Sequence, residues 1–266
     1  MEKANSYSSL GPVAVNLWAE SAQALPWQVC RSIATQRQIT GTVSLHLKDL
    51  FKGGSTTALA IPTYAFLGII FDWERNWVSK NHQRQLTTVE NLGICTLASL
   101  EAAPLVNLFE LFFTHKQTNK EKRSYIATAR FIYQGGARAF FRGMPFTAMR
   151  DVLYGSMVYV ITPYLQQKLL ACIGKEHSIK TEWGALIISG IVTGGICALL
   201  SHPFDTIRSW MMQDVHRTEF PTLKSIYDKK LLGKNWKVLL SGARSRGLGI
   251  VSAMVIVSGV RYFFMS

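Results

Sequence analysis

The chain has 266 residues, of which 48% are hydrophobic and only 17% are charged, and its formal net charge is +13. This charged fraction is below the roughly 25% that is usual for soluble domains. The basic residues lie in segments between apolar runs and form no stripe with interleaved aromatic residues. The composition therefore disfavours a protein that binds nucleic acid and favours a membrane protein with basic loops.

Six apolar stretches follow one another along the chain, and polar residues interrupt most of them. Only the fifth has the composition of a conventional spanning helix, because no Asp, Glu, Lys or Arg lies between Trp183 and Phe204. Since lipid does not tolerate the polar residues, they predict helices that line a water-filled cavity; the alternative is a soluble bundle of amphipathic helices. The stretches lie near 8–35, 54–76, 90–114, 147–170, 182–213 and 244–264, and their polar residues include Asn16, Glu20, Thr56, Thr57, Glu101, Asn107, Arg150 and Asp151.

Glycines in the fifth stretch argue against the soluble alternative. Gly184 and Gly195 would weaken a soluble helix. Gly190 and Gly194 have the spacing that lets two helices pack closely inside a membrane. The sequence therefore predicts an all-α membrane protein.

The six stretches pair into three similar units. Each odd stretch ends in a segment that starts with proline, at Pro26, Pro104 and Pro203, and a polar or basic connector then leads to a glycine and an even stretch. Such repetition predicts six transmembrane helices in three pseudo-symmetric repeats, of about 8–80, 88–172 and 181–266, within a single domain of residues 1–266. In transporters built from repeats, the substrate site lies near the bilayer midplane at the repeat axis.

Asp205 and Arg208 follow the kink expected at Pro203 and lie on one face of the same helix. Two interpretations are about equally favoured by these residues alone. The pair belongs to a gate at the helix end, or it is a surface pair that reaches toward the membrane–water interface.

Two segments of the chain resemble the mitochondrial carrier family most closely. GIVTGGICALLSHPFDTIRSWMMQ, residues 190–213, is similar to the fifth helix of that family, and ARAFFRGMPFTAMRDVLYG, residues 137–155, is similar to its matrix helix, glycine turn and fourth helix. The resemblance extends from about residue 8 to 264. It implies six tilted helices with short matrix helices, and exchange or import of metabolites across the inner mitochondrial membrane by alternating access.

The resemblance also implies two gates, both of which depart from the family pattern. At the matrix gate, Asp205 is expected to pair with Arg31, while the second repeat has lost both of its charges. The intermembrane-side gate keeps Asp72 and Arg75 in the first repeat, and the corresponding places in the other repeats have no acid. The residues expected at the matrix gate are Gln28, Arg31, Val106, Phe109, Asp205 and Arg208.

Arg150 and Asp151 occupy the substrate-contact position of the fourth helix, where the resemblance implies an amino-acid-like or carnitine-like zwitterion. The acid would hold an ammonium group and the arginine a carboxylate. Alternatively the two residues pair with each other or with neighbouring helices and fill the cavity. The glycine turns are expected to bind a lipid phosphate, in particular that of cardiolipin. The residues implied there are Gly53, Arg142, Gly143, Ser241 and Gly242.

These observations predict a multi-pass protein of the mitochondrial inner membrane that is not an enzyme and uses no cofactor or metal. The first functional hypothesis is solute exchange by alternating access. The second is a carrier-derived structural subunit of a larger inner-membrane complex, with transport lost and the matrix end closed by apolar packing of Val106 and Phe109. The partners expected are cardiolipin, a small-molecule substrate and other subunits of such a complex, and no nucleic acid.

Overall fold

Helices make up every regular element in the described part of the computed structural model, which covers residues 11–40, 54–118, 124–174, 178–232 and 236–265. In chain order they are α1 (Pro12–Thr40), α3 (Gly54–His82), α4 (Thr88–Thr118), α5 (Tyr125–Gln134), α6 (Ala137–Phe140), α7 (Met144–Gly155), a π-helical turn η1 (Ser156–Ile161), α8 (Thr162–Ile173), α9 (Ile179–Gln213), α10 (Leu223–Ile226), a π-helical turn η2 (Tyr227–Leu231), a 3₁₀ helix η3 (Trp236–Leu240) and α11 (Ala243–Met265).

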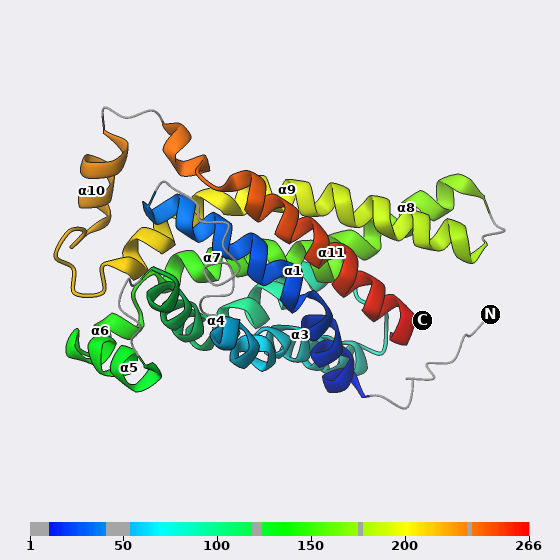
Figure 1. Cartoon of the computed structure of the whole chain (residues 1–266). Helices are drawn as coiled ribbons and strands as arrows, with labels where there is room; N and C mark the ends of the chain where they lie inside the picture. Colours follow the sequence, from blue (N-terminus) through cyan, green and yellow to red (C-terminus); the bar gives the residue numbers. More distant parts are fainter. Residues whose placement is uncertain (1–10, 41–53, 119–123, 175–177, 233–235, 266) are drawn as a thin grey trace.

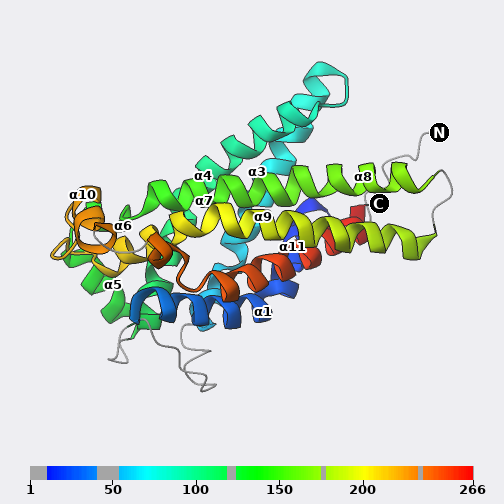
Figure 2. The ribbon, with the colours of Figure 1, turned by 90° about the horizontal axis from the view of Figure 1, so that it is seen from above.

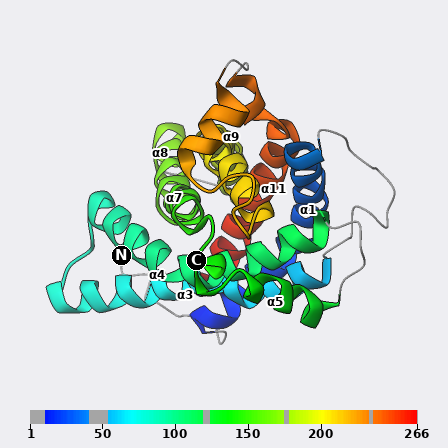
Figure 3. The ribbon, with the colours of Figure 1, turned by 90° about the vertical axis from the view of Figure 1, so that its left-hand side faces the viewer.

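Six long rods form a closed ring. Segments α7, η1 and α8 make one continuous rod, and α1, α3, α4, α9 and α11 make the others. Around the ring, α1 contacts α3, α3 contacts α4, α4 contacts α7, α7 contacts α9, α9 contacts α11, and α11 contacts α1. Figure 3 shows the rods from one end, and Figure 2 shows the tip of the α3–α4 hairpin projecting away from the other rods.

The two ends of the ring differ. The start of α1, the end of α8 and the end of α11 lie at one end, which we call the α8 end (Figure 1). The short helices α5, α6 and α10 lie at the other, which we call the α10 end. The short helix expected in the first repeat falls in residues 41–53, outside the described residues, as does Gly53.

The prolines expected to end or kink the odd helices lie inside them. α1 continues past Pro26, α4 past Pro104 and α9 past Pro203. Starts of α5 and α9 are capped by serine side chains: Ser124 accepts from the Ala127 N–H and Ser178 from the Thr181 N–H. Such caps satisfy backbone donors that have no partner inside the helix.

Most polar residues that interrupt the apolar stretches are buried inside the ring, while large apolar side chains cover its outside; Glu101 is exposed, contrary to the expectation that it lines the cavity. Asn16 and Glu20 are buried, whereas Leu199 is 67% exposed on α9 and Ile188 is also exposed. This inside-out distribution is typical of a protein whose outer surface meets lipid. By length and composition, Thr88–Lys116, Ile179–Gln213 and Ala243–Phe264 could cross a membrane. An arrangement with six spans stays a prediction.

Glycines bring α9 and α11 into close contact. A Cβ atom added to Gly190 would lie 2.9 Å from Val255 Cγ2, and one added to Gly194 would lie 2.9 Å from Val251 Cα. Both glycines therefore face α11, in agreement with the small-residue spacing in the sequence. A Cβ atom at Gly195 would meet nothing within 4 Å.

Candidate functional site

Glu110 is the centre of a buried ionic cluster. Its side chain, on α4, is 1% exposed and lies 2.7 Å from Arg208 Nη1 and 3.2 Å from Arg150 Nη1. Arg31 of α1 forms a third ion pair with it, and the Tyr64 hydroxyl of α3 donates to Glu110 Oε1 at 2.6 Å. One carboxylate thus compensates three guanidinium groups, each of which would be costly to bury alone.

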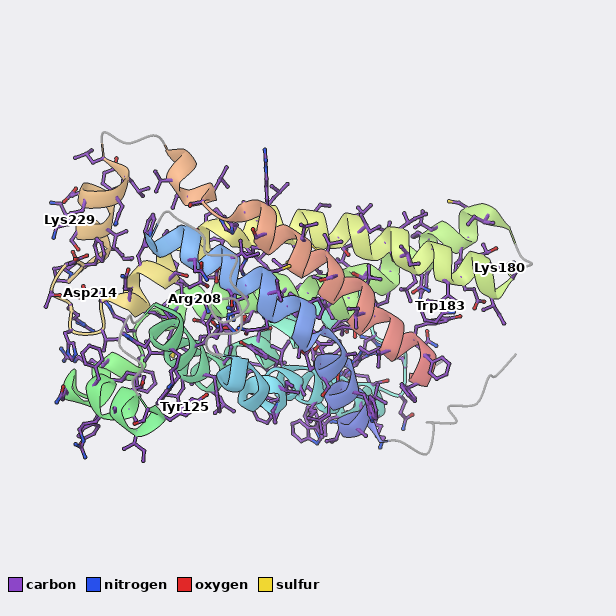
Figure 4. The ribbon with its side chains drawn as sticks, viewed as in Figure 1. Tyr125, Lys180, Trp183, Arg208, Asp214 and Lys229 are labelled. Atoms are coloured by element: carbon purple, nitrogen blue, oxygen red, sulfur yellow. The ribbon has the colours of Figure 1, made fainter. Side chains whose placement is uncertain are left out.

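Asp205, on α9, is a second carboxylate that pairs with several arginines. It pairs with Arg246 of α11, with Arg208 on its own helix and with Arg150, whose Nη1 is 3.7 Å from Asp205 Oδ1. Arg150 also pairs with its neighbour Asp151 at 2.6 Å. We call this group the arginine cluster; its charged members are Glu110, Asp151, Asp205, Arg31, Arg150, Arg208 and Arg246. Together with Tyr64 they come from all six rods, and Figure 4 shows Arg208 inside the bundle.

A smaller ionic cluster lies nearer the α8 end. Arg261 of α11 binds Asp72 of α3, with Nη2 2.7 Å from Oδ1, and its guanidinium lies 4.8 Å from the ring centroid of Tyr159 in η1. The Asn16 side chain of α1 donates to Asp72 Oδ2 at 2.9 Å. We call these residues the Asp72 cluster. Asn16 is close to the start of α1 and Arg261 is close to the end of α11, so the cluster lies toward the α8 end.

A cavity of about 50 Å³ lies between the two clusters. Along α1 the order is Asn16 of the Asp72 cluster, then Glu20, Gln23 and Trp27 on the cavity wall, then Arg31 of the arginine cluster. The remaining wall residues are Tyr64, Leu67, Val106, Glu110, Arg150, Asp151, Tyr154, Ser201, Arg246 and Ile250. This volume is enough for ordered water or one small polar group. It is far below the several hundred Å³ of a typical ligand pocket.

The structure pairs the expected gate residues differently from the sequence prediction. Among the described residues, no ion pair joins Asp205 to Arg31, although both line a second small cavity of about 10 Å³. Their partners are Arg246 and Glu110, respectively. The gate positions of the second repeat, Val106 and Phe109, carry no charge, but Glu110, one residue beyond Phe109, supplies an acid that was not assigned to the gate from the sequence. α-Helical geometry turns Glu110 about 100° from Phe109, toward the centre of the ring.

The other predicted gate residues lie outside the arginine cluster. Gln28 donates to Ser32 Oγ at 3.0 Å on the same helix. Val106 lies on the cavity wall, and Phe109 is half-buried. Asp72 binds Arg261, which the sequence had assigned no acid partner, and Arg75 is exposed.

Arg142, which the resemblance assigns to a lipid-binding turn, makes its contacts within the protein. Its buried guanidinium donates to the backbone carbonyls of Met211 and Phe220 and lies 3.8 Å from Asp214 Oδ2. Burial lowers the pKa of Arg142, and the nearby Arg217 lowers it further. Although burial alone would raise the pKa of Asp214, hydrogen bonds led by the Phe220 N–H hold it below its ordinary value.

Gly143 and Gly242 occupy equivalent places before α7 and α11. Their φ angles are +81° and +82°, a left-handed conformation that glycine adopts without strain. A Cβ atom at Gly242 would lie 2.9 Å from the Ala34 carbonyl oxygen. Ser241 holds the same turn, since its carbonyl oxygen lies 3.0 Å from His202 Nε2.

Several members of the two clusters were not predicted from the sequence as site residues. Glu110 stands inside an apolar stretch, which by itself marks an ionisable residue as a functional candidate. Tyr64 carries no comparable signal, and Arg246 lies in the basic first turns of α11, where the sequence alone suggests an ordinary charge of the connector. Glu20 and Asn16 were recognised as polar residues inside a span, without an assigned role.

No family model matches the chain. It is 23% identical over 79% of its length to a mitochondrial glutathione transporter of Xenopus tropicalis. It is 30% identical over 34% of its length to a mitochondrial glycine transporter of Mycosarcoma maydis, and 27% identical over 36% to a mitochondrial phosphate carrier of Caenorhabditis elegans. The matches cover 60%, 23% and 27% of these relatives, so none is matched over two thirds of its own length. All three are mitochondrial carriers.

Proposed function

We propose that this chain, a divergent member of the mitochondrial carrier family, moves a small solute across the mitochondrial inner membrane by alternating access. The observation that carries the proposal is a cavity, lined in part by charged side chains, between two ionic clusters that link the rods of the ring. Each cluster is built from charged side chains on different rods, so separating the rods at one end breaks ion pairs at that end only. Alternating access needs two such states that differ by a few kcal/mol.

The proposed topology places all six rods across the membrane. Support comes from the buried polar residues of α1 and α3, which lower the hydropathy of these rods because they face the cavity and not lipid. The basic connectors are assigned to the matrix side by the positive-inside rule. Anionic lipid, cardiolipin above all, is the partner we propose at the glycine turns that start α7 and α11.

The substrate we propose is a small zwitterion that resembles an amino acid. Two of the relatives are transporters of glycine and glutathione, and both of these compounds carry an ammonium and a carboxylate group. The cavity wall carries carboxylates and guanidinium groups together, as recognition of such a substrate requires.

Uptake into liposomes tests this function. Purified protein is reconstituted with and without cardiolipin, and entry of labelled amino acids, carnitine, nucleotides and carboxylates is measured beside a Glu110→Gln variant. We expect the unmodified protein to transport at least one amino acid, faster with cardiolipin, and the variant to lose this uptake because three arginines lose their common partner.

The alternative function is the carrier-derived structural subunit. The small volume of the cavity and the dense ion pairing of Arg150 favour it, because both leave little room for a substrate. Correctly folded protein that transports none of these solutes and copurifies with an inner-membrane complex would decide for this alternative. The double variant Val106→Asp, Phe109→Lys is the control for this alternative. If the protein is a structural subunit, the double variant should also show no solute uptake.

A further inference from the structure

The lining of the cavity includes buried hydrogen-bond acceptors, some of which lack a donor. The Glu20 carboxylate accepts a hydrogen bond from Gln23 Nε2 and forms no ion pair among the described residues. Gln23 Oε1 and Asp151 Oδ2 have no hydrogen-bond partner in the part of the chain that the structure describes. All three residues are more than nine-tenths buried. Unsatisfied acceptors at this depth cost free energy unless a donor reaches them.

A second, smaller cavity has an excess of donors in its lining. The second cavity adjoins the first, because Trp27, Arg150 and Arg246 line both. Its wall carries four guanidinium groups, from Arg31, Arg150, Arg208 and Arg246, against the single carboxylate of Asp205. Arg246 Nε is buried and has no hydrogen-bond partner among the described residues. The two cavities together thus have a negative end and a positive end.

We propose that this polarity orients a zwitterionic substrate, with a primary ammonium group held by Glu20, Gln23 and Asp151 and a carboxylate group directed toward Arg246 and Arg208. The inference rests on the proposed transport function and deepens it. Its assignment differs from the sequence expectation, in which Arg150 takes the carboxylate. Arg150 already pairs with Glu110, Asp151 and Asp205, which leaves it the least available arginine.

The same contacts select an amino acid over a carnitine-like compound. A primary ammonium group offers three N–H donors, which matches the acceptors of Glu20, Gln23 and Asp151. A quaternary ammonium group has the same charge and no N–H donor, so it would leave those acceptors unsatisfied. The cavity of about 50 Å³ suits a head group of the smaller kind.

Matched small compounds test the orientation directly. The stabilisation of the purified full chain against heat is measured with glycine, alanine, serine, trimethylglycine, methylamine and acetate. We expect an amino acid with a free ammonium group to stabilise the protein at a concentration about tenfold or more below that needed for trimethylglycine, methylamine or acetate. Equal effects of glycine and trimethylglycine, or of glycine and acetate, would overturn the proposal, as would no effect of any amino acid.

A pair of variants locates the ammonium site. Glu20→Gln keeps the shape of the side chain and removes its charge, and we expect it to weaken amino-acid binding and uptake about tenfold or more. Glu101→Gln is the control, because Glu101 is an exposed carboxylate on α4 outside the cavity wall. Unchanged binding by Glu20→Gln would show that Glu20 holds only a proton or water, and would reject the site.

The outcomes separate this inference from the proposed function. Uptake of phosphate or a dicarboxylate, with no amino acid bound or transported, retains the transporter and rejects the ammonium site. Binding of an amino acid that depends on Glu20, without any uptake, retains the site and rejects transport.

Discussion

Glu110 is the residue on which the interior of the ring most depends. Three arginines from three different rods converge on its carboxylate, and Tyr64 donates a hydrogen bond to it. Such an arrangement contributes little net stability compared with apolar packing, since every member must be desolvated. Removing the Glu110 carboxylate, in contrast, lowers stability, because it leaves three positively charged guanidinium groups buried side by side.

We therefore predict that Glu110→Gln destabilises the protein by about 3–5 kcal/mol, the usual cost of breaking a buried ion pair. In detergent, the midpoint of thermal unfolding should fall by roughly 10 °C or more. Glu101→Gln removes an exposed carboxylate from the same helix and should leave the midpoint nearly unchanged. A Glu110→Gln midpoint within about 2 °C of the unmodified protein would contradict the role assigned to Glu110.

At the same scale, the sequence identified which side chains carry charge into the interior more reliably than it identified their partners. Arg31, Asp205 and Arg208 were assigned to the matrix gate and Arg150 to the substrate position, and all four belong to the arginine cluster. Their partners could not be derived in advance. An arginine side chain reaches several ångströms, so a small rotation of a helix decides which of two nearby carboxylates it contacts.

At the scale of single elements, adjacent glycines on α9 have opposite surroundings. Gly194 faces α11, where a Cβ atom would lie 2.9 Å from the Val251 backbone, and Gly195 faces open space. Substitutions at these two neighbouring positions therefore measure two effects separately. Gly194 reports on close packing against α11, and Gly195 reports on the intrinsic cost of glycine in a helix.

Gly194→Ala should destabilise the protein by about 1–3 kcal/mol, because α11 must move away to accommodate the methyl group. Gly195→Ala should be neutral or stabilise by up to about 1 kcal/mol, because alanine is the better helix former and nothing opposes its Cβ atom. Thermal unfolding of the two single variants is the measurement. Equal effects at both positions would show that α9 and α11 do not pack as described.

At the scale of the whole molecule, the sequence predicted a helical membrane protein of the carrier type, and the relatives and the apolar helices agree with it. This prediction was possible because it depends on local signals, namely proline, glycine and charged residues that recur at similar places in three segments of the sequence. The closure of the ring is a global property that depends on the tilt of each rod, and the division into three repeats stays a prediction.

The Asp72 cluster should decide how often the α8 end opens. We predict that Asp72→Asn increases access of water to the cavity, because Arg261 and Asn16 lose the carboxylate that links α3 to α11 and α1. A loss of about 1.4 kcal/mol at this end raises the open population about tenfold. A Ser201→Cys reporter on the cavity wall, in a Cys172→Ser background, should then react faster with a water-soluble maleimide.

The matched control for that experiment is Asp228→Asn, which removes an exposed carboxylate from η2 at the α10 end. Its labelling rate should equal that of the reporter alone. If Asp72→Asn also leaves the rate unchanged, the Asp72 cluster does not hold this end shut.

The π-helical turn η1 has a consequence for the comparison of the three repeats. An α-helix advances about 100° per residue, and a π turn accommodates one additional residue, so α8 is rotated by about that angle relative to a continuation of α7. Counting residue by residue from the glycine turn at Gly143 therefore reaches the wrong face of the rod beyond Ile161. If the predicted repeats hold, Thr162 and Pro163 are thus out of phase with their apparent counterparts in α3 and α11, and one residue must be left unmatched before the predicted gate positions are compared.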